Sequence, residues 1–218
     1  LTSIKGSLDL LNSGALGPVP EAMAPLVDIA TKNSARLSNL INDILDFQKI
    51  EAGEMTYNFD EVEISRLVTD AIEANRGYAD SLGITIRGDL PAGDLVFVQG
   101  DESRLMQVMA NIISNALKFS HEGGEVVVGY EILGAQVRVF VQDHGDGIPE
   151  EARKMVFDRF TQLDSSDQRK VGGTGLGMNI SRQIVEQHDG QIDFVSETGV
   201  GTTFYVILDV HDPLAEDE

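Results

Sequence analysis

A seven-residue repeat of apolar side chains runs through residues 26–47 and limits what this part of the chain can fold into. The stripe advances in alternating steps of four and three residues, which is typical of a long helix that packs one seam against other helices. A shorter stripe with helical spacing lies within residues 1–11, and a segment rich in glycine and proline, residues 14–20, separates the two. The longer stripe consists of Leu26, Ala30, Asn33, Leu37, Leu40, Ile44 and Phe47.

This pattern predicts a helical hairpin over residues 1–52. The two stripes, together with a flanking row of Ile29, Ile41 and Leu45, are wider than two helices can bury between them. One interpretation is that the hairpin packs on the rest of the same chain. The other is that two copies of the chain join their hairpins into a four-helix bundle. The length of the heptad run favours the second, a homodimer through residues 1–52.

Beyond residue 60 the pattern changes to short strands between helices, which indicates a different layer architecture. We predict an α+β fold: an N-terminal helical hairpin, then an α/β sandwich whose mixed, largely antiparallel sheet is covered by helices. The expected domains are residues 1–60 and 61–211, followed by an acidic tail over 212–218. Helices are expected over 64–82, 101–119, 150–157 and 176–188, with Asp101 as an N-cap, and strands over 84–87, 95–99, 126–132, 137–142, 191–196 and 203–210.

The charge balance and the lack of cysteine exclude several classes of function. The chain has 36 acidic and 16 basic residues, a net charge of −20, so it lacks the basic surface that nucleic acids and anionic membranes require. Without cysteine it can form neither a disulfide nor a thiol nucleophile. No apolar run approaches the roughly 18 residues of a membrane span. We therefore expect a cytoplasmic region with no nucleic-acid or membrane contact, although the parent protein could still be membrane-anchored.

Two polar segments of the second domain carry residues suited to phosphate and amine recognition. In NIISNALKF, residues 111–119, the spacing of Asn111, Asn115 and Lys118 puts two carboxamides and an ammonium on one helix face, where they could contact Mg²⁺ and phosphate oxygens. In DHGDGIP, residues 143–149, a carboxylate at a strand end could accept from an exocyclic amine, and the glycines allow close approach of a ligand. The alternatives are a solvated helix face and an ordinary turn.

Two further segments could bind phosphate groups. In FDRFTQ, residues 157–162, an arginine between two phenylalanines could reach a phosphate; the alternative is a short helix pinned by its aromatic rings. In GGTGLGM, residues 172–178, a glycine-rich loop leads into a helix, whose free N–H groups and dipole favour an anion; the alternative is a flexible hinge. Each of the four segments is weak evidence by itself, but all four in this order are specific.

The four segments, in this order, resemble the N, G1, F and G2 boxes of the ATP-binding domain of histidine kinases, a family shared with type II topoisomerases, Hsp90 and MutL. The flanking DESRLMQV (101–108) and GVGTTF (199–204) resemble the lead-in and the closing hairpin of that domain. Upstream, LINDILDFQKIEAG (40–53) is similar to the end of the second dimerisation helix of sensor histidine kinases. The resemblance covers nearly the whole chain and implies that residues 61–211 form the ATP-binding catalytic domain.

The resemblance also implies a phospho-accepting histidine that these residues do not include. LTSIKG (1–6) is similar to the segment just after that histidine, which would lie six residues before Leu1. We therefore expect the acceptor and a sensor region to belong to a longer parent protein. All four histidines of the chain lie outside the hairpin: His121, His144, His188 and His211.

Roles for the matching positions come from the same resemblance. Asp143 would bind the adenine amino group, with Thr202 nearby. Asn115 would help to hold Mg²⁺. The catalytic residues would be Asn111, Lys118 and Arg159, of which the first two also contact the phosphates of ATP. The other cofactor-binding residues would be Phe119, Gly145, Gly147, Ile148, Gly173, Thr174, Gly175, Leu176 and Gly177.

Position 111 distinguishes between branches of this family. The topoisomerase and Hsp90 branches are expected to carry a glutamate there that activates water, and an asparagine cannot accept a proton at neutral pH. We therefore expect a protein-histidine kinase that uses ATP and Mg²⁺ to phosphorylate a histidine and passes the phosphate to an aspartate of a response regulator. The alternatives are another ATPase or a serine kinase on the same fold, or a dimeric scaffold without catalysis.

Overall fold

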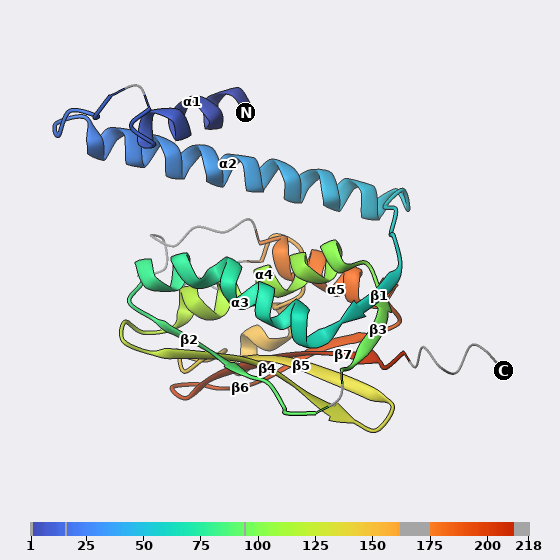
Figure 1. Ribbon diagram of the computed structural model, residues 1–218. Helices are drawn as coiled ribbons and strands as arrows, with labels where there is room; N and C mark the ends of the chain where they lie inside the picture. The colour runs from blue at the N-terminus through green and yellow to red at the C-terminus, as the bar shows by residue number, and fades with distance from the viewer. Residues whose placement is uncertain (1, 16, 94, 162–174, 212–218) are drawn as a thin grey trace. The chain divides into compact units, whose positions relative to one another are not determined.

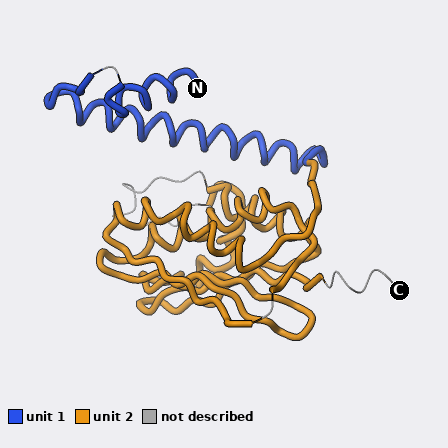
Figure 2. Tube along the Cα trace, in the orientation of Figure 1, with its two compact units in different colours: residues 1–55 blue, residues 56–218 orange. Residues whose placement is uncertain are grey.

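The computed structural model describes residues 2–15, 17–93, 95–161 and 175–211, and they form two units (Figure 2). Unit 1 comprises Leu1–Met55 and unit 2 comprises Thr56–Glu218. The division lies a few residues before the boundary near residue 60 that the sequence pattern indicated. Among the described residues, no helix has both the length and the apolar character needed to cross a membrane.

Unit 1 is a hairpin of two helices, α1 (Thr2–Asn12) and α2 (Ala24–Glu51). The Asn12 side chain donates a hydrogen bond to the hydroxyl of Thr31 at 3.0 Å and so joins the end of α1 to α2. Gly53, with a φ of +67°, ends α2 in the left-handed conformation that glycine adopts without strain. The hairpin expected over residues 1–52 is therefore present.

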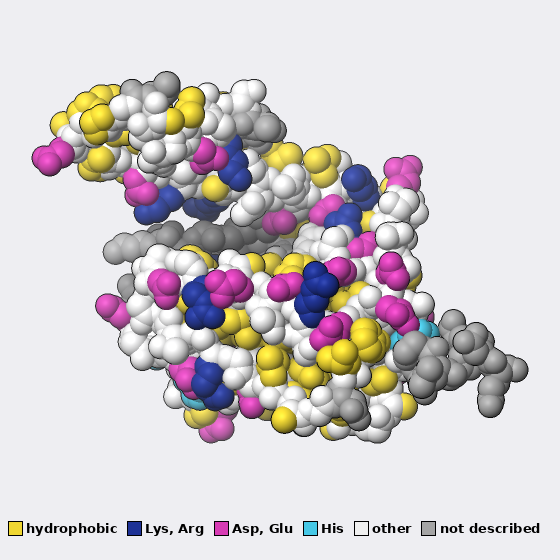
Figure 3. Space-filling view, in the orientation of Figure 1, with side chains coloured by type: hydrophobic (Ala, Val, Ile, Leu, Met, Phe, Trp, Pro, Cys, Tyr) yellow, Lys and Arg dark blue, Asp and Glu magenta, His cyan; other side chains and the backbone are white. Residues whose placement is uncertain are grey.

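The apolar stripes of the hairpin are exposed in the single chain. Leu26, Leu37 and Ile44 of the heptad stripe have exposed fractions of 65%, 45% and 39%. The flanking row, Ile29, Ile41 and Leu45, is exposed as well. Figure 3 shows apolar side chains gathered on this unit. Such a surface is unusual for a helix without a partner.

Unit 2 contains a five-stranded sheet in the order β2-β4-β5-β7-β6, with helices α3, α4 and α5 on one face (Figure 1). Strands β2 and β4 are parallel and the other pairs are antiparallel, which confirms the predicted α+β class and the mixed, largely antiparallel sheet. The helices are α3 (Ile64–Ser81), α4 (Glu102–Phe119) and α5 (Gly177–Gln187), and the strands are β2 (Thr85–Asp89), β4 (Glu125–Leu133), β5 (Gln136–Gln142), β6 (Gln191–Glu197) and β7 (Gly201–Asp209).

The core of unit 2 lies between this sheet and the three helices. Alternate residues of β5, namely Val137, Val139 and Val141, are buried. They face apolar rows of the helices, because a strand presents every second side chain to one face and a helix every third or fourth. Fully buried residues of the helices include Ile64 and Val68 of α3, Ile112, Ile113 and Leu117 of α4, and Ile180 and Ile184 of α5.

One element differs from the sequence-based expectation. Strand β1 (Asp60–Glu63), which was not predicted, pairs antiparallel with β3 (Phe97–Gly100) in a second, two-stranded sheet. Its sequence DEVE buries a single apolar residue, Val62, and so carries no alternating signal. The short helix expected over 150–157 is present as a 3₁₀ helix, η1 (Glu150–Met155). The tail over 212–218 lies outside the described residues.

Candidate nucleotide-binding site

Asp143 comes directly after β5 and is held in place by two backbone groups. Its Oδ1 accepts hydrogen bonds from the N–H groups of Gly145 at 2.9 Å and Thr202 at 3.2 Å. Its own N–H donates to the carbonyl oxygen of Thr202 at 2.8 Å. Within the described part of the chain, Oδ2 has no donor. The carboxylate is therefore oriented by one oxygen and offers the other as an acceptor.

The environment of Asp143 also changes its acidity. Burial raises the pKa of this carboxyl above its ordinary value, and the N–H groups of Gly145 and Thr202 and the nearby His144 offset part of that rise. A buried carboxylate whose second oxygen lacks a donor gains most from a ligand that brings an N–H. The exocyclic amine of a nucleobase is such a ligand.

Thr202, whose backbone N–H bonds to Asp143, also carries a hydroxyl group that lies next to that of Ser196. The Oγ of Ser196 accepts from the N–H of Ile148 at 2.7 Å and lies 2.8 Å from the Oγ1 of Thr202. Ser196 and Thr202 are both buried. Sequence reasoning missed Ser196, because a single serine in a strand carries no motif. The observable signal was its spacing from Thr202, which puts the two opposite each other across the β6–β7 hairpin.

Two glycines after Asp143 allow unusually close packing. A Cβ atom at Gly145 would overlap the carbonyl oxygen of Phe119, the last residue of α4. A Cβ atom at Gly147, where φ is +70°, would overlap the carbonyl oxygen of Glu197 at the end of β6. The DHGDGIP loop is therefore clamped between the end of α4 and the β6–β7 turn, at a point where only glycine fits.

The polar stripe of α4 is half-buried, and its members have different surroundings. The Nδ2 of Asn111 donates to the carbonyl oxygen of Gly177 at 3.1 Å and to the Oγ of Ser181 at 3.2 Å, so this side chain fastens α4 to the first turn of α5. The Nζ of Lys118 lies 4.8 Å from the ring centre of Phe119. Sequence reasoning expected Asn111 to face the phosphates and did not expect its bonds to α5.

Asn115, on the same stripe, has a side-chain oxygen of the kind that binds magnesium. It is half-buried, and no hydrogen bond of its carboxamide is found among the described residues. In the described ranges no group of three or more His, Cys, Asp or Glu side chains could hold a metal ion. A Mg²⁺ ion here would therefore take one oxygen from Asn115 and most of its other ligands from phosphate oxygens and water, as Mg²⁺ commonly does.

The aromatic segment and the glycine-rich loop contact each other at their described ends. The N–H of Phe160 donates to the carbonyl oxygen of Gly175 at 3.0 Å. The carbonyl oxygen of Phe157 accepts from the Nδ2 of Asn179 at 2.9 Å. Leu176 is buried, and Arg159 is exposed. Gly173 and Thr174, which were expected to contact the nucleotide, lie outside the described residues.

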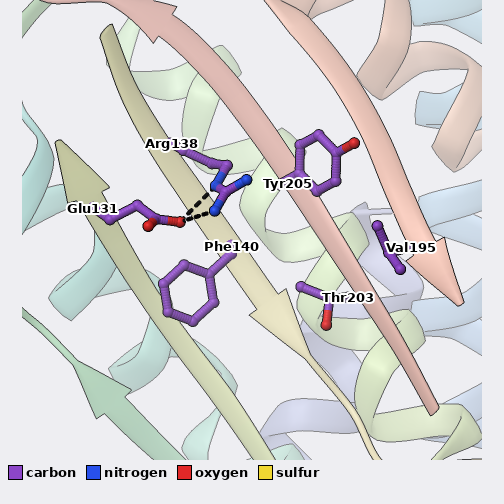
Figure 4. A pocket seen from close by; sticks show the side chains of 6 residues that line it. All are labelled: Glu131, Arg138, Phe140, Val195, Thr203 and Tyr205. Atoms are coloured by element: carbon purple, nitrogen blue, oxygen red, sulfur yellow. Dashed lines mark hydrogen bonds and ion pairs between the residues drawn. The ribbon is translucent and has the colours of Figure 1, made fainter. Parts of the chain in front are cut away.

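The structure thus joins the four sequence segments in pairs. Asn111 is hydrogen-bonded to Gly177 and Phe160 to Gly175, and Gly145 packs closely against Phe119. Two cavities formed by described residues lie elsewhere. One, of about 310 Å³, is on the sheet face opposite the helices (Figure 4), and one of about 320 Å³ lies beside α5 and β6. Neither is lined by a residue predicted to contact the nucleotide, so the candidate site is inferred from its polar groups.

Comparison with known proteins identifies the family. Residues 100–212 match the family described as "Histidine kinase-, DNA gyrase B-, and HSP90-like ATPase". Residues 1–53 match the "His Kinase A (phospho-acceptor) domain". The chain belongs to the sensor histidine kinases. The family that the sequence motifs resemble is thereby confirmed.

Characterised histidine kinases are similar over nearly all of this chain. The circadian input-output histidine kinase CikA of Synechococcus elongatus is 36% identical over 207 residues, which are 94% of this histidine kinase chain and 28% of CikA. The sensor histidine kinase WalK of Bacillus subtilis is 34% identical over 220 residues, which are 100% of this chain and 35% of WalK. The chain therefore spans only about a third of the length of these relatives.

Solved structures of histidine kinases share the fold. Full-length ShkA, crystallised in complex with AMPPNP, superimposes with a TM-score of 0.76 at 26% identity over 95% of this chain and 42% of ShkA. The mycobacterial sensor histidine kinase MprB superimposes with a TM-score of 0.60 at 26% identity over 71% of this chain and 99% of that one. The first covers both units of this chain.

Proposed function

We propose that this histidine kinase chain is an ATP-dependent phosphotransferase core. In this proposal it binds Mg-ATP at the site around Asp143 and transfers the γ-phosphoryl group to a histidine of the dimerisation region. The phosphate then passes to an aspartate of a response regulator. Residues 1–55 provide the dimerisation hairpin and residues 56–211 the nucleotide-binding unit, and a reducing cytoplasmic compartment is consistent with the lack of cysteine.

The observation that carries the proposal is the hydrogen bonding of Asp143. Two backbone N–H groups hold Oδ1, and Oδ2 is available to accept from the adenine amine. The hydroxyl of Thr202, which lies 2.8 Å from the Oγ of Ser196, could hold a bridging water. A partly desolvated acceptor of this kind discriminates between bases, because a base without the amine leaves it unpaired.

The phosphates would lie toward the α4 stripe and the glycine-rich loop. Lys118 supplies positive charge there and Asn115 an oxygen ligand for Mg²⁺, which neutralises phosphate charge when bound. Transfer breaks the bond from the γ-phosphorus to the bridging oxygen, which leaves with ADP, and forms a bond to an imidazole nitrogen, whose proton is released. Asn111 offers no base to activate water, so the site favours transfer over hydrolysis. Arg159 would stabilise the transferred group.

The exposed stripes of unit 1 support the dimer. Two copies would bury Leu26, Leu37, Ile44 and their neighbours in a four-helix bundle and so remove an apolar surface that a single chain leaves in water. This is the homodimer that the heptad pattern favours.

The first test is calorimetric titration of the chain with ADP and Mg²⁺. The wild type should bind saturably, and Asp143→Asn should weaken binding at least tenfold, or about 1.4 kcal/mol. Asp146→Asn is the matched control, because that carboxylate lies in the same loop but is exposed. If the wild type does not bind nucleotide, the scaffold alternative is favoured.

The second test separates a histidine kinase from the other enzymes of this fold. A longer form of the protein that includes a histidine at the expected place should acquire a phosphate that is labile in acid and stable in base. A phosphate stable in acid would indicate a serine kinase. Rapid steady-state release of phosphate without protein labelling would indicate an ATPase.

A further inference from the structure

His188, the residue that caps α5, joins two helices through both of its ring nitrogens. Its Nδ1 lies 2.7 Å from the carbonyl oxygen of Ile184, one turn earlier in α5. Its Nε2 lies 2.9 Å from the backbone N–H of Asp101, the residue that precedes α4. Since a carbonyl only accepts, Nδ1 carries the proton, and Nε2 is then free to accept from Asp101. The two contacts of the buried ring thus make Nδ1 the donor and Nε2 the acceptor.

The side chain of Asp101 extends this connection to a third segment. Its Oδ1 accepts from the N–H of Arg104 at 3.1 Å and from the hydroxyl of Ser103 at 2.7 Å, as an N-cap does. Its Oδ2 accepts from the N–H of Asn58 at 2.9 Å. Asn58 lies only three residues after Met55, where unit 1 ends. One residue therefore joins α4 to the start of unit 2.

Aromatic rings from the same segment lie against the imidazole. The ring centre of Phe59 is 4.8 Å from that of His188, at an interplanar angle of 37°. The ring of Tyr57 meets His188 edge-on at 5.8 Å and lies 6.1 Å from Phe59. Tilted and edge-on arrangements at such separations are the ones that aromatic rings prefer.

The backbone at Gly100 also lies close to the ring. A Cβ atom at Gly100, the end of β3, would lie 2.9 Å from the Cδ2 of His188. A larger residue at position 100 would therefore displace the ring. Phe59 itself is 45% exposed, so the cluster extends from the buried His188 to the surface.

We propose that His188 is a positioning residue that fastens the connection between the dimerisation hairpin and the nucleotide-binding unit. Together with Asp101 it holds residues 57–59 against the start of α4 and the end of α5. Helix α4 carries Asn111 and Asn115 further along, and α5 follows the glycine-rich loop. The point at which the chain leaves the nucleotide-binding unit is thereby fixed relative to the bound nucleotide. The consequence for phosphoryl transfer rests on the proposed function. The attachment of residues 57–59 to the nucleotide-binding unit does not depend on it.

The structural part is tested by hydrogen exchange on the 218-residue chain. Phe59→Leu removes the ring that faces His188 and, as a half-exposed position, should leave the fold intact. We expect the amide of Asn58 to exchange at least tenfold faster, while amides in the centre of α4 keep their protection. His188→Phe, which keeps a ring but loses both hydrogen bonds, should also release Asn58. Tyr78→Leu is the matched control, with 40% exposure on α3, and should leave Asn58 unchanged.

The exchange experiment has outcomes that contradict the proposal. If the amide of Asn58 keeps its protection in Phe59→Leu, the contact between Phe59 and His188 does not hold residues 57–59 in place. If all amides of unit 2 lose protection equally, the cluster contributes only to global stability. Phe59→Tyr retains the ring, so it should retain wild-type exchange.

The functional part is tested in the longer form that carries an acceptor histidine. Phe59→Leu should lower kcat for histidine phosphorylation at least fivefold and leave KM for ATP within twofold, and Phe59→Tyr should restore kcat. An unchanged kcat in a variant whose Asn58 is released would overturn the positioning role. If wild-type protein does not bind nucleotide, the proposed function fails, but the exchange experiment still decides whether the connection is fastened.

Discussion

Asp143 is the residue on which most of the proposed chemistry depends, and its acidity gives the first prediction. Because burial raises the pKa of Asp143 above the ordinary value of 3.8, protonation should begin at a higher pH than for an exposed aspartate. Nucleotide binding should use the charged form, which is the better acceptor for an amine. ADP affinity should therefore be full at neutral pH and fall as the pH drops through this raised pKa.

Calorimetry with ADP and Mg²⁺ at neutral and mildly acidic pH measures this effect. Asp143→Asn should bind weakly at both values, and its affinity should change less with pH than that of the wild type. Equal pH dependence in the two proteins would assign the titration to another group. The raised pKa of Asp143 also affects stability. At neutral pH the charged Asp143 lowers the free energy of unfolding relative to an exposed aspartate, and protonation at lower pH removes this loss.

Gly145 gives a second prediction at the scale of one residue. Gly145→Ala would place a methyl group on the carbonyl oxygen of Phe119, so the loop or the end of α4 must move. We expect a loss of about 1–3 kcal/mol in the free energy of unfolding, as for other overpacked sites. ADP binding should also weaken, because Asp143 moves with the loop. Urea unfolding and calorimetry measure the two effects.

The matched control for this change is Gly77→Ala. Gly77 lies inside α3, and a Cβ atom there has no neighbour within 4 Å. This substitution should stabilise the protein by roughly 0.5–1 kcal/mol, because alanine favours a helix interior over glycine. If Gly145→Ala is as well tolerated as Gly77→Ala, the close packing at Gly145 has no energetic importance.

At the scale of elements, the sequence predicted those whose side chains have a clear period. Each of the helices α3, α4 and α5 buries the face that carries its apolar row. The strands β5 and β7 likewise bury every second side chain, so the period in the sequence equals the period of burial. Strand β1 was not predicted, because it depends on pairing with β3, a strand far along the chain. Tertiary contacts of this kind leave no local period.

The candidate site shows the same limit. Asp143 was predictable as a strand-end carboxylate in a glycine-rich motif. The contacts of Asn111 with Gly177 and Ser181, and those of Ser196 with Ile148 and Thr202, join residues that lie far apart in the sequence or carry no motif. His188 was noted in the sequence only as a histidine outside the hairpin. Its two ring nitrogens acquire their partners, one in α5 and one just before α4, only after the chain folds.

The start of α4 gives a prediction at this scale. Asp101→Ala removes the N-cap and the acceptor for Asn58, so the free energy of unfolding should fall by about 1–2 kcal/mol at neutral pH. Burial alone would raise the pKa of Asp101, but the hydrogen bonds from Asn58, Ser103 and Arg104 outweigh it and lower that pKa below the ordinary 3.8. The carboxylate therefore stabilises the fold above pH 3.8, and this contribution is lost as the pH falls through the lowered pKa.

Urea unfolding at several pH values checks the sign. The difference between wild type and Asp101→Ala should be largest near neutral pH and shrink once the pH falls below 3.8. Asp80→Ala, an exposed carboxylate on α3, serves as the control and should have little effect at any pH. A difference that grows on acidification would contradict this account of Asp101.

At the scale of the whole molecule, the exposed stripes of unit 1 predict how the chain associates. Leu37→Asp should place a charge in the seam of the proposed bundle and convert a dimer into a monomer. Nucleotide affinity should stay within twofold, because the site lies within unit 2. Analytical ultracentrifugation measures the mass. Asn39→Asp adds the same charge to an exposed polar position of α2 and should leave the dimer intact.

A monomeric wild type at micromolar concentration would contradict the dimer and favour the interpretation in which the hairpin packs on its own chain. A dimer that survives Leu37→Asp would mean that the copies associate through another surface.

The second sheet has a practical consequence for dissecting the protein. Residues 57–63 supply two rings to His188, a hydrogen bond to Asp101 and the strand that pairs with β3. A nucleotide-binding fragment cut at residue 61, where the hydrophobic pattern changes, would lose the rings and the hydrogen bond and break the strand pair. Its truncated edge would expose β3 to other chains. A fragment that begins at Thr56 keeps this edge covered, so the better place to divide the gene is five codons earlier than the sequence pattern indicates.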